Sequence, residues 1–483
     1  MRAALIILCA CATRAAPPPF TPTPHGALVR AGNYYVELAV AGLSSFRVSV
    51  VNDGGAGAPP TQLPTLLVAP QAAFAPHNVS AAGAVVTLRA PFGALSIDAA
   101  AGTLALADAA GAPLAASAAP LATTGGGATV FAFALAPGAE LLGSGADGAS
   151  AQTLPRAGAV ASVGNRVVWT PSFWCSDRWS MLAVSPLPPD NTSTYPVAYA
   201  AAGARVDVTV GGGARGAGNV DLYLSPARDL RAHVLVNARL SGAPAVPPRF
   251  AFGFLACRWG WASQEYTEGV LATFRNRSLP LDAFISDFEW FTTITDYELP
   301  PQGLANYSDF SFNNVTWPPP AAPLVAYYRD KYNARFGGIR KPRLGNSALL
   351  VEAQARGFLM GQGGDPARAP DGSRNTNFSI AAFRAWYAAQ QAPLLVAGVA
   401  LWWDDEGESG YTTYAEWTRA HQLTIDASAA PARRLLAINR AFIPGAQRLG
   451  AVVWTGDISP TWTDCSFDAH NAAAPAAQLP TLT

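Results

Sequence analysis

The sequence predicts a mixed β plus α/β chain, with an N-terminal β-sandwich over residues 25–240 and a (β/α)8-type (TIM) barrel over residues 247–483. Short runs rich in β-branched and aromatic residues fill the first half between Gly, Pro and Ala turns. The second half alternates short apolar runs with helical stretches, which is the pattern of a parallel sheet. Acidic residues follow several of these apolar runs, where a barrel carries its active site.

The composition argues against several classes of function. The chain has 483 residues, a formal net charge of +0 and a sequence pI of 7.0, so its charge does not point to nucleic acid or an acidic membrane surface. Beyond the N-terminus, no apolar run is long and clean enough for a transmembrane helix. The histidines are scattered without metal-ligand spacing, so we expect neither a metal nor a cofactor.

The first 16 residues have the features of a secretory signal peptide. Arg2 precedes a short apolar core, and small residues follow it. Removal of Cys9 and Cys11 with this segment would leave an odd and sparse set of cysteines, which does not make a disulfide framework. N-x-Ser/Thr sequons begin at Asn78, Asn191, Asn276, Asn306, Asn314 and Asn377. These features together predict a glycoprotein that is secreted or lumenal in the secretory pathway.

The strands expected in the β-sandwich carry β-branched and aromatic residues with some alternation. They are Tyr34–Val40, Ser45–Val51, Ala84–Ala90, Thr129–Leu135 and Ala204–Val210. Ala100–Ala128 is so rich in Ala and Gly that we expect a weakly ordered hairpin or loop there. A short helix is expected over Arg228–Leu240, and the Gly/Pro-rich run after it marks the boundary between the two domains.

The region after this boundary alternates strands and helices. The expected strands are Phe250–Cys257, Leu281–Ile285, Phe336–Ile339, Val396–Trp403, Arg434–Asn439 and Ala451–Trp454, and the expected helices are Glu265–Asn276, Ala322–Tyr332, Ser379–Gln391 and Tyr414–Gln422. We count about six strands, where a complete barrel needs eight. We therefore expect a barrel that is incomplete at its C-terminal end, with two unpaired sheet edges.

Two stretches of this region end an apolar run in tryptophan and then in acidic residues. Gly398–Tyr411 carries four acids, and Gly450–Asp457 ends in a single aspartate. Because the carboxyl ends of parallel strands meet on one face of a barrel, we expect Asp405 to lie near Asp457. Two carboxylates between aromatic walls suit glycoside hydrolysis. The alternative is that the acids are polar turn residues that cap the next helix.

Four motifs, in order, resemble those of glycoside hydrolase family 31, the α-glucosidase and α-xylosidase family. SGAPAVPPRFAFGFLACRWGW is similar to the family's linker and first barrel strand, and LPLDAFISDFEWF to its second-strand motif. WWDDEGE resembles the nucleophile motif, and RAFIPGAQRLGAVVWTGD resembles the segment that ends in the acid/base aspartate. The resemblance extends from about Tyr34 to Trp462, is strongest from Ser241 onward, and implies the same two-part fold.

Carried onto this chain residue by residue, the resemblance implies a retaining reaction by double displacement. Asp405 would attack the anomeric carbon, and Asp457 would protonate the leaving oxygen. Such a pair needs carboxyl groups about 5–5.5 Å apart, one of them ionised and the other protonated. Arg440 would bind sugar hydroxyls and hold Asp405 in its ionised form.

The remaining matches would shape the subsite of the reacting sugar. Asp287 would bind sugar hydroxyls, and the alternative for this residue is a strand-end cap. Trp403 and Trp454 would form apolar walls for the C–H face of a pyranose, and Glu408 would support the site from behind. Two further acids of the nucleophile loop are expected to be solvated loop residues: Asp404 and Glu406. Arg448 is expected to form a structural ion pair, and such a pair is also the alternative for Arg440.

The chain departs from the family pattern at two places. We find no counterpart of the last two barrel strands or of the histidine that follows them in the family. The segment Met360–Ser379 also contains fewer aromatic residues than its counterpart in the family. The predicted function is hydrolysis of O-glycosyl bonds in α-glucoside-type carbohydrates. The alternatives are a catalytically inactive or fragmentary carbohydrate-binding relative, an α-xylosidase, or an α-transglucosylase.

Overall fold

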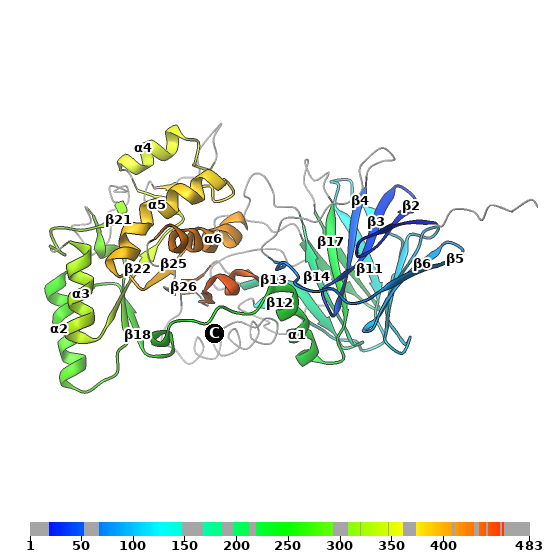
Figure 1. The fold of residues 1–483 in the computed structure, drawn as a ribbon, viewed down its shortest axis with the longest axis horizontal. Coiled ribbons are helices and arrows are strands. Elements are labelled where there is room, and N and C mark those ends of the chain that lie inside the picture. The colour runs from blue at the N-terminus through cyan, green and yellow to red at the C-terminus, as the bar shows by residue number, and fades with distance from the viewer. Residues whose placement is uncertain are drawn as a thin grey trace, which may run out of the picture.

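The computed structural model describes residues 19–52, 67–146, 168–185, 197–211, 219–292, 308–318, 320–345, 347–360, 373–407, 411–428, 434–440, 443–454 and 456–457. In Figure 1 a β-rich first part lies beside a second part, in which helices flank a curved parallel sheet. The predicted order, a β-rich domain followed by a partial (β/α) barrel, is confirmed for these residues. The predicted signal peptide, residues 1–16, lies outside them.

The described residues of the first part form three antiparallel sheets. The largest sheet has the spatial order β1 (Phe20–Thr23), β2 (Gly26–Ala31), β3 (Tyr34–Ala41), β4 (Ser45–Asn52), β17 (Val220–Pro226), β14 (Trp179–Val184), β13 (Val168–Cys175) and β12 (Leu141–Ala146). The second sheet contains β5 (Asn78–Ala82), β6 (Val85–Ala90), β7 (Gly93–Asp98), β8 (Thr103–Asp108) and β9 (Pro113–Ala116). The third contains β10 (Ala122–Thr123), β11 (Thr129–Ala134), β16 (Arg205–Val210) and β15 (Val197–Ala202).

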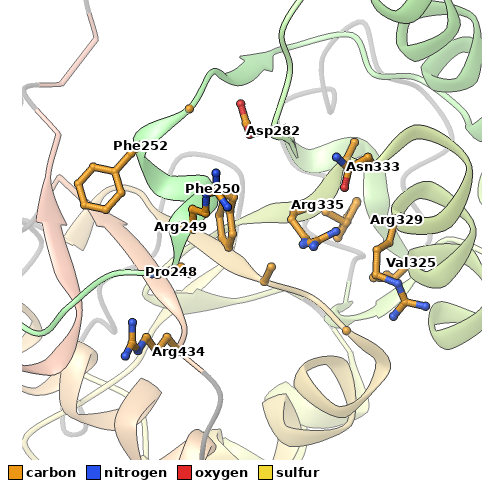
Figure 2. A pocket seen from close by; sticks show the side chains of 15 residues that line it. Pro248, Arg249, Phe250, Phe252, Asp282, Val325, Arg329, Asn333, Arg335 and Arg434 are labelled. Carbon is orange, nitrogen blue, oxygen red and sulfur yellow. The ribbon is translucent and has the colours of Figure 1, made fainter.

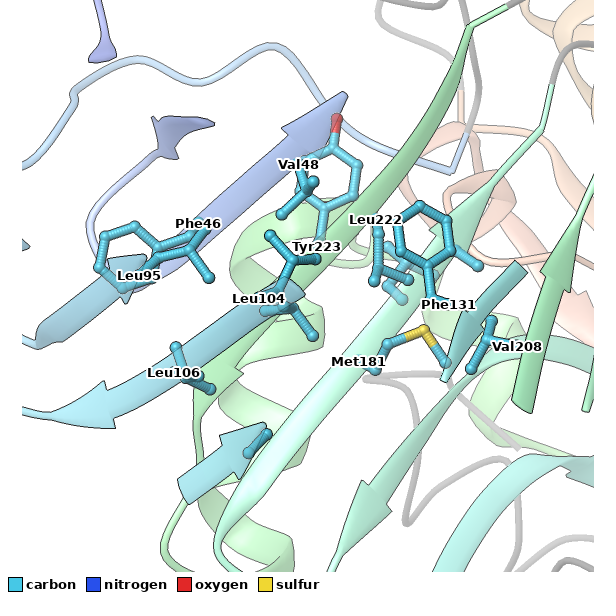
Figure 3. Close-up of a cluster of buried hydrophobic side chains, with 14 of the residues drawn as sticks. Phe46, Val48, Leu95, Leu104, Leu106, Phe131, Met181, Val208, Leu222 and Tyr223 are labelled. Atoms are coloured by element: carbon cyan, nitrogen blue, oxygen red, sulfur yellow. The ribbon is translucent and has the colours of Figure 1, made fainter. Parts of the chain in front are cut away.

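One apolar core joins the large sheet to both smaller sheets. Figure 3 shows Phe46 and Leu222 of the large sheet in one cluster with Leu104 of the second sheet and Phe131 of the third. In β6 and β8 alternate residues face this core, as expected for a sheet with one buried face, whereas β14 and β17 in the large sheet are buried on both faces. The first part is therefore a layered β domain of the predicted sandwich kind.

Ala100–Ala128 contributes β8, β9 and β10, so the predicted weak order was wrong, whereas the hairpin that the prediction allowed is formed by β8 and β9. Leu104 and Leu106 are 2% exposed and pair across β7 with Ile97 and Leu95. Two large side chains on one face suffice to anchor an alanine-rich strand, since the two-residue period buries both of them together.

A helix and a linker lead from the β domain to the barrel. α1 (Leu230–Ser241) begins at Asp229, whose side chain accepts a hydrogen bond of 2.8 Å from the Ala232 amide. The buried ring of His233 in α1 lies 2.7 Å from Oγ of Ser180 in β14. α1 agrees with the predicted helix and is fixed to the large sheet.

The end of the barrel returns to this helix. In η4 (Ala446–Leu449), Gln447 donates a hydrogen bond of 3.0 Å to Oγ of Ser241, and Arg448 donates one of 2.8 Å to the Ser241 carbonyl. Ile443 and Ala446 also belong to the apolar core of the β domain. Arg448 thus has the predicted structural role, and the segment that precedes Asp457 packs on the β domain.

Six parallel strands form the curved sheet of the described barrel, in the order in which they occur in the chain. They are β18 (Leu255–Arg258), β19 (Ala283–Ser286), β22 (Arg335–Arg340), β25 (Leu401–Asp404), β26 (Leu436–Asn439) and β27 (Ala451–Val453). The helices are α2 (Gln264–Asn276), α3 (Ala321–Tyr332), α4 (Ala348–Ala355), α5 (Ala381–Ala397) and α6 (Tyr411–Ala427), as Figure 1 shows. The predicted count of about six strands is confirmed for this part of the chain.

The two faces of the barrel sheet have different partners. Phe284, Phe336 and Trp402 belong to a core shared with α2 and α3. Ile285 and Leu401 belong to a smaller cluster on the opposite, inner face. Short elements that the sequence did not predict are η1 (Arg249–Phe252), η2 (Phe288–Trp290), β20 (Phe291–Thr292), β21 (Ser308–Phe312), β23 (Arg343–Leu344), β24 (Arg374–Asn375) and α4.

The strand predicted to begin at Val396 begins at Leu401. α5 continues to Ala397 and ends at Gly398. The φ of Gly398 is 116°, and its backbone amide donates a hydrogen bond to the Leu394 carbonyl, which caps the helix. The apolar run before the tryptophans is therefore divided between a helix and a strand. Apolarity alone does not distinguish a buried helix end from a buried strand.

Candidate active site

Charged residues gather where neighbouring barrel strands end. Asp287 follows β19, Lys341 follows β22, Asp405 follows β25, Arg440 follows β26, and Asp457 lies a short loop beyond β27. The parallel register brings these ends to one edge of the sheet. The carboxyl edge is where (β/α) barrels carry their active sites.

Asp405 is a buried carboxylate that faces three donors. Its side chain is 8% exposed. Oδ1 accepts a hydrogen bond of 2.9 Å from the Glu406 amide and lies 3.0 Å from Nη1 of Arg440. Oδ2 accepts a hydrogen bond from Nζ of Lys341. Each contact directs an N–H group or a positive charge at the carboxylate, so the surroundings stabilise its negative charge.

Arg440 links Asp405 to Asp457. Its Nη1 lies 3.0 Å from Oδ1 of Asp405 and donates a hydrogen bond of 3.0 Å to Oδ2 of Asp457. Because one atom contacts both oxygens, these oxygens are at most about 6 Å apart, which is compatible with the spacing of a retaining pair. The Asp457 side chain is 65% exposed, in contrast to that of Asp405.

Two tryptophans flank this pair. The rings of Trp403 and Trp454 meet edge to face, with their centres 5.1 Å apart, and both side chains are partly exposed. The guanidinium of Arg440 lies 5.4 Å from the centre of the Trp454 ring. The neighbouring Trp402 faces the other way and stacks on Trp290 inside the core. Trp403 and Trp454 therefore supply the apolar surface beside the carboxylates.

Asp287 is 6% exposed, and its Oδ1 accepts a hydrogen bond of 2.8 Å from the Phe288 amide. This contact is the strand-end cap that was one interpretation of the residue. Burial raises the pKa of Asp287 to about 7, although the positive charge of Lys341 opposes the shift, and the negative charges of Glu289 and Asp405 add to it. Its coupling to Asp405 and Lys341 places Asp287 in the same electrostatic cluster.

Lys341 and Glu406 are contact residues of Asp405 that the sequence analysis missed. Nζ of Lys341 bonds to Oδ2 of Asp405 and lies 2.9 Å from Oε1 of Glu406, while Arg343 contacts the other Glu406 oxygen. Glu406 is a partly solvated loop residue, as predicted, with a side chain that is 36% exposed, but its two ion pairs were not foreseen. The available signal was the position of Lys341, one of two lysines in the chain, directly after a barrel strand.

Asp404 is fully buried, so its prediction as a solvated loop residue was wrong. Its Oδ2 lies 2.8 Å from Nε2 of His421 in α6. Nδ1 of His421 lies 3.0 Å from Oε1 of Gln391 in α5, which also accepts a hydrogen bond of 2.9 Å from Thr424. Asp404 faces the helices and Asp405 faces the site, because adjacent residues at a strand end point to opposite faces.

Glu408, which the family resemblance assigned to support the site, lies outside the described residues. Within the described ranges, no group of three or more His, Cys, Asp and Glu side chains is arranged to hold a metal ion. No helix in these ranges is both long and apolar enough to cross a membrane.

A cavity of about 1090 Å³ lies at the opposite edge of the barrel sheet, as Figure 2 shows. Its lining includes Phe250, Asp282, Arg335 and Arg434, which precede or begin their strands. Active sites of this fold form at the carboxyl ends of the strands, so this cavity is not the candidate active site.

Neighbouring carboxylates and aromatic walls at the carboxyl edge of a (β/α) barrel define a site of the glycoside hydrolase type. Residues 244–476 match the model of the glycosyl hydrolases family 31 TIM-barrel domain. The barrel region of the chain thus matches glycoside hydrolase family 31, as its motifs predicted.

Curated relatives match the chain over part of their length. It is 25% identical over 238 residues to the 1,6-alpha-glucosyltransferase of Sporosarcina globispora and 24% identical over 262 residues to the neutral alpha-glucosidase C of Macaca fascicularis. These alignments cover 45% and 47% of this chain, and 18% and 32% of the two relatives. The chain thus spans less than a third of the length of either relative.

Solved structures match nearly the whole chain in fold. A family 31 alpha-xylosidase from a soil metagenome, complexed with xylose, has a TM-score of 0.78 at 16% identity, with 95% of this chain and 70% of that chain covered. A family 31 dextranase from Flavobacterium johnsoniae, complexed with glucose, has a TM-score of 0.77 at 16% identity, with 95% and 59% covered. The shared fold therefore includes both the β domain and the barrel.

Proposed function

We propose that this protein is a retaining α-glycosidase that hydrolyses α-glucoside-type substrates by double displacement. The observation that carries the proposal is the double contact of Arg440, whose Nη1 lies 3.0 Å from an oxygen of Asp405 and 3.0 Å from an oxygen of Asp457. Retaining glycosidases need two carboxyl groups close enough to act on one sugar carbon from both sides.

In the first step, an oxygen of Asp405 forms a bond to the anomeric carbon while the bond from that carbon to the leaving oxygen breaks. Asp457 gives its proton to the leaving oxygen in the same step. In the second step, Asp457 accepts a proton from water, the water oxygen bonds to the anomeric carbon, and Asp405 leaves as a carboxylate. Arg440 and the other donors around Asp405 stabilise the carboxylate charge that Asp405 carries before the first step and again after the second.

The sugar would pack against the joint surface of Trp403 and Trp454, whose partly exposed rings suit the C–H face of a pyranose. Asp287, with its pKa near 7, would exchange hydrogen bonds with sugar hydroxyls as either acid or carboxylate. The negative charges around the anomeric carbon favour the positive, oxocarbenium-like transition state. These features support a carbohydrate substrate.

We propose a location in the secretory pathway for this activity. The signal-peptide pattern of residues 1–16 supports it. Among the predicted glycosylation sites, the side chains of Asn78, Asn276 and Asn314 are exposed in the structure and accessible to a glycan.

Transglycosylation is a second candidate function. The match to the 1,6-alpha-glucosyltransferase of Sporosarcina globispora favours it. The chemistry at Asp405 and Asp457 is the same, except that a sugar hydroxyl replaces water in the second step. Incubation with an α-glucosyl donor and analysis of the products separate the two functions, because transfer produces saccharides longer than the donor and hydrolysis produces free glucose.

The test of the proposed chemistry is mass spectrometry after incubation with 5-fluoro-α-glucosyl fluoride. This probe forms the glycosyl-enzyme and slows its breakdown. We expect one added 5-fluoroglucosyl group on the peptide that contains Asp405, and no addition in the Asp405→Ala variant. Folded protein without a covalent adduct would contradict a retaining glucosidase. A parallel incubation with 5-fluoro-α-xylosyl fluoride tests the xylosidase alternative.

A further inference from the structure

A row of alternating charges crosses the carboxyl edge of the barrel. Its members, in order of contact, are Arg343, Glu406, Lys341, Asp405, Arg440 and Asp457. Lys341 contacts a carboxylate on either side, and so does Arg440. Because each inner member has two opposite partners, loss of one member changes the orientation of its neighbours.

Lys341 is the most buried cation of this row, with a side chain that is 3% exposed. Its Nζ contacts Asp405 and Glu406 and lies 4.9 Å from the centre of the Phe288 ring. Burial lowers the pKa of Lys341, and the negative charge of Asp405 opposes that shift. A buried ammonium is costly without carboxylate partners, so its position depends on the nucleophile loop.

The nucleophile loop in turn depends on Lys341, through Glu406. The Glu406 φ of 58° lies in the left-handed region, which residues with a side chain seldom adopt. Lys341 and Arg343 both hold its carboxylate. The bend directs the Glu406 amide at Oδ1 of Asp405, at 2.9 Å. Lys341 therefore acts on Asp405 directly and also through the bend that follows it.

The two oxygens of Asp405 are not equivalent. Oδ1 faces both the Glu406 amide and Arg440, whereas the partner of Oδ2 among the described residues is Lys341. A carboxylate oxygen has two lone pairs, so the described contacts leave one lone pair of Oδ2 for bond formation.

We propose that Lys341 is a positioning residue of the nucleophile, which leaves Oδ2 of Asp405 as the attacking oxygen, and this inference rests on the proposed glycosidase function. The Oδ2–carbon bond forms as the bond to the leaving oxygen breaks, and the proton of Asp457 goes to that oxygen. Lys341 keeps its proton throughout. The charge of Asp405 disappears in the glycosyl-enzyme and returns in the second step, beside Lys341.

This proposal has a kinetic consequence. Release of the glycosyl group requires the carboxylate charge of Asp405 to return beside Lys341. Loss of Lys341 therefore slows breakdown of the glycosyl-enzyme.

The kinetic test compares Lys341→Met with Lys331→Met, its matched control. Lys331, the other lysine of the chain, lies on α3 with a side chain that is 51% exposed. For Lys341→Met we expect at least about tenfold slower decay of the 5-fluoroglucosyl-enzyme. Lys341→Arg should recover part of this rate, because it restores the positive charge. Folded Lys341→Met with the decay rate of the parent would overturn the proposal.

A second measurement does not require turnover. In protein labelled with [ζ-¹⁵N]lysine, the two lysine side chains give two signals, which Lys331→Arg assigns. We expect Asp405→Asn to shift the Lys341 signal and leave the Lys331 signal in place. An unmoved Lys341 signal would overturn the proposed pairing. If the parent forms no glycosyl-enzyme, the proposed function fails, and this measurement alone decides whether Lys341 positions Asp405.

Discussion

The two carboxylates of the candidate site have opposite surroundings. Asp405 is 8% exposed and faces Lys341, Arg440 and the Glu406 amide. Asp457 is 65% exposed and is joined to the row by Arg440. One carboxylate is fixed inside the protein, and the other meets solvent at the end of the row.

This difference matches the two tasks of a retaining pair. A nucleophile must be ionised and oriented before substrate binds, and dense donors achieve both. An acid/base residue must exchange protons with water between steps, which an exposed position allows. The comparison therefore supports Asp405 as the nucleophile and Asp457 as the acid/base.

The largest expected effect is that of Asp405→Asn. The variant keeps the shape of the side chain but removes the charge and the nucleophile, so we expect a loss of kcat by about 10⁴-fold or more. The measurement is hydrolysis of an aryl α-glucoside by parent and variant, with circular dichroism as the control for folding. Activity within tenfold of the parent would assign the nucleophile elsewhere.

Asp457→Ala sharpens the comparison because its effect depends on the leaving group. General acid catalysis contributes about 10²–10⁴-fold, so we expect a loss of that size on an alkyl α-glucoside. Fluoride needs little protonation to leave, so formation of the glycosyl-enzyme from α-glucosyl fluoride should change little. An equal loss of this first step on both substrates would argue against Asp457 as the acid.

Asp404→Asn tests whether the residue next to the nucleophile has a structural role. The change breaks a buried contact with His421, and we expect a loss of about 3–5 kcal/mol in the free energy of unfolding. Urea titration measures the loss. Asp426→Asn, an exposed change on α6, is the matched control and should remain within about 0.5 kcal/mol of the parent. If Asp404→Asn changes the free energy of unfolding as little as Asp426→Asn does, Asp404 does not have the structural role that we assign to it.

Asp287→Asn should change how stability depends on pH. The pKa of Asp287 in the folded protein, about 7, lies above its ordinary value of 3.8, so the folded state binds this proton more tightly than the unfolded state. The parent therefore loses stability as the pH rises from near 4 through 7. The Asp287→Asn variant does not lose this stability, because asparagine does not titrate in this range. From pH 5 to pH 8, we expect the stability of the variant relative to the parent to rise by on the order of 2 kcal/mol. Urea titrations at both pH values with a constant difference would contradict this account.

The sequence was sufficient to place the main acids of the site. Asp405 and Asp457 each follow an apolar strand with tryptophan, and strand ends of a parallel sheet meet at one edge. The structure brings Arg440 beside Asp405, where the sequence hypothesis had it, and also beside Asp457. These inferences depend on local pattern and on a topology that has few alternatives.

Other contacts could not be predicted from the sequence, because they depend on packing between distant segments. Lys341 reaches Asp405 from another strand, and this contact requires the register of β22 with β25. His421 meets Asp404 through the packing of α6 on the outer face of the sheet. In Ala100–Ala128, composition concealed a two-residue period of leucines. The errors thus fall where tertiary contacts override local composition.

The most direct test of the paired carboxylates is the anomeric form of the first product. Proton NMR during hydrolysis of an α-glucoside distinguishes α-glucose from β-glucose before mutarotation mixes them. A double displacement at Asp405 with Asp457 as the acid/base releases α-glucose first. Release of β-glucose first would mean a single displacement by water and would contradict the account of Asp405 as a nucleophile.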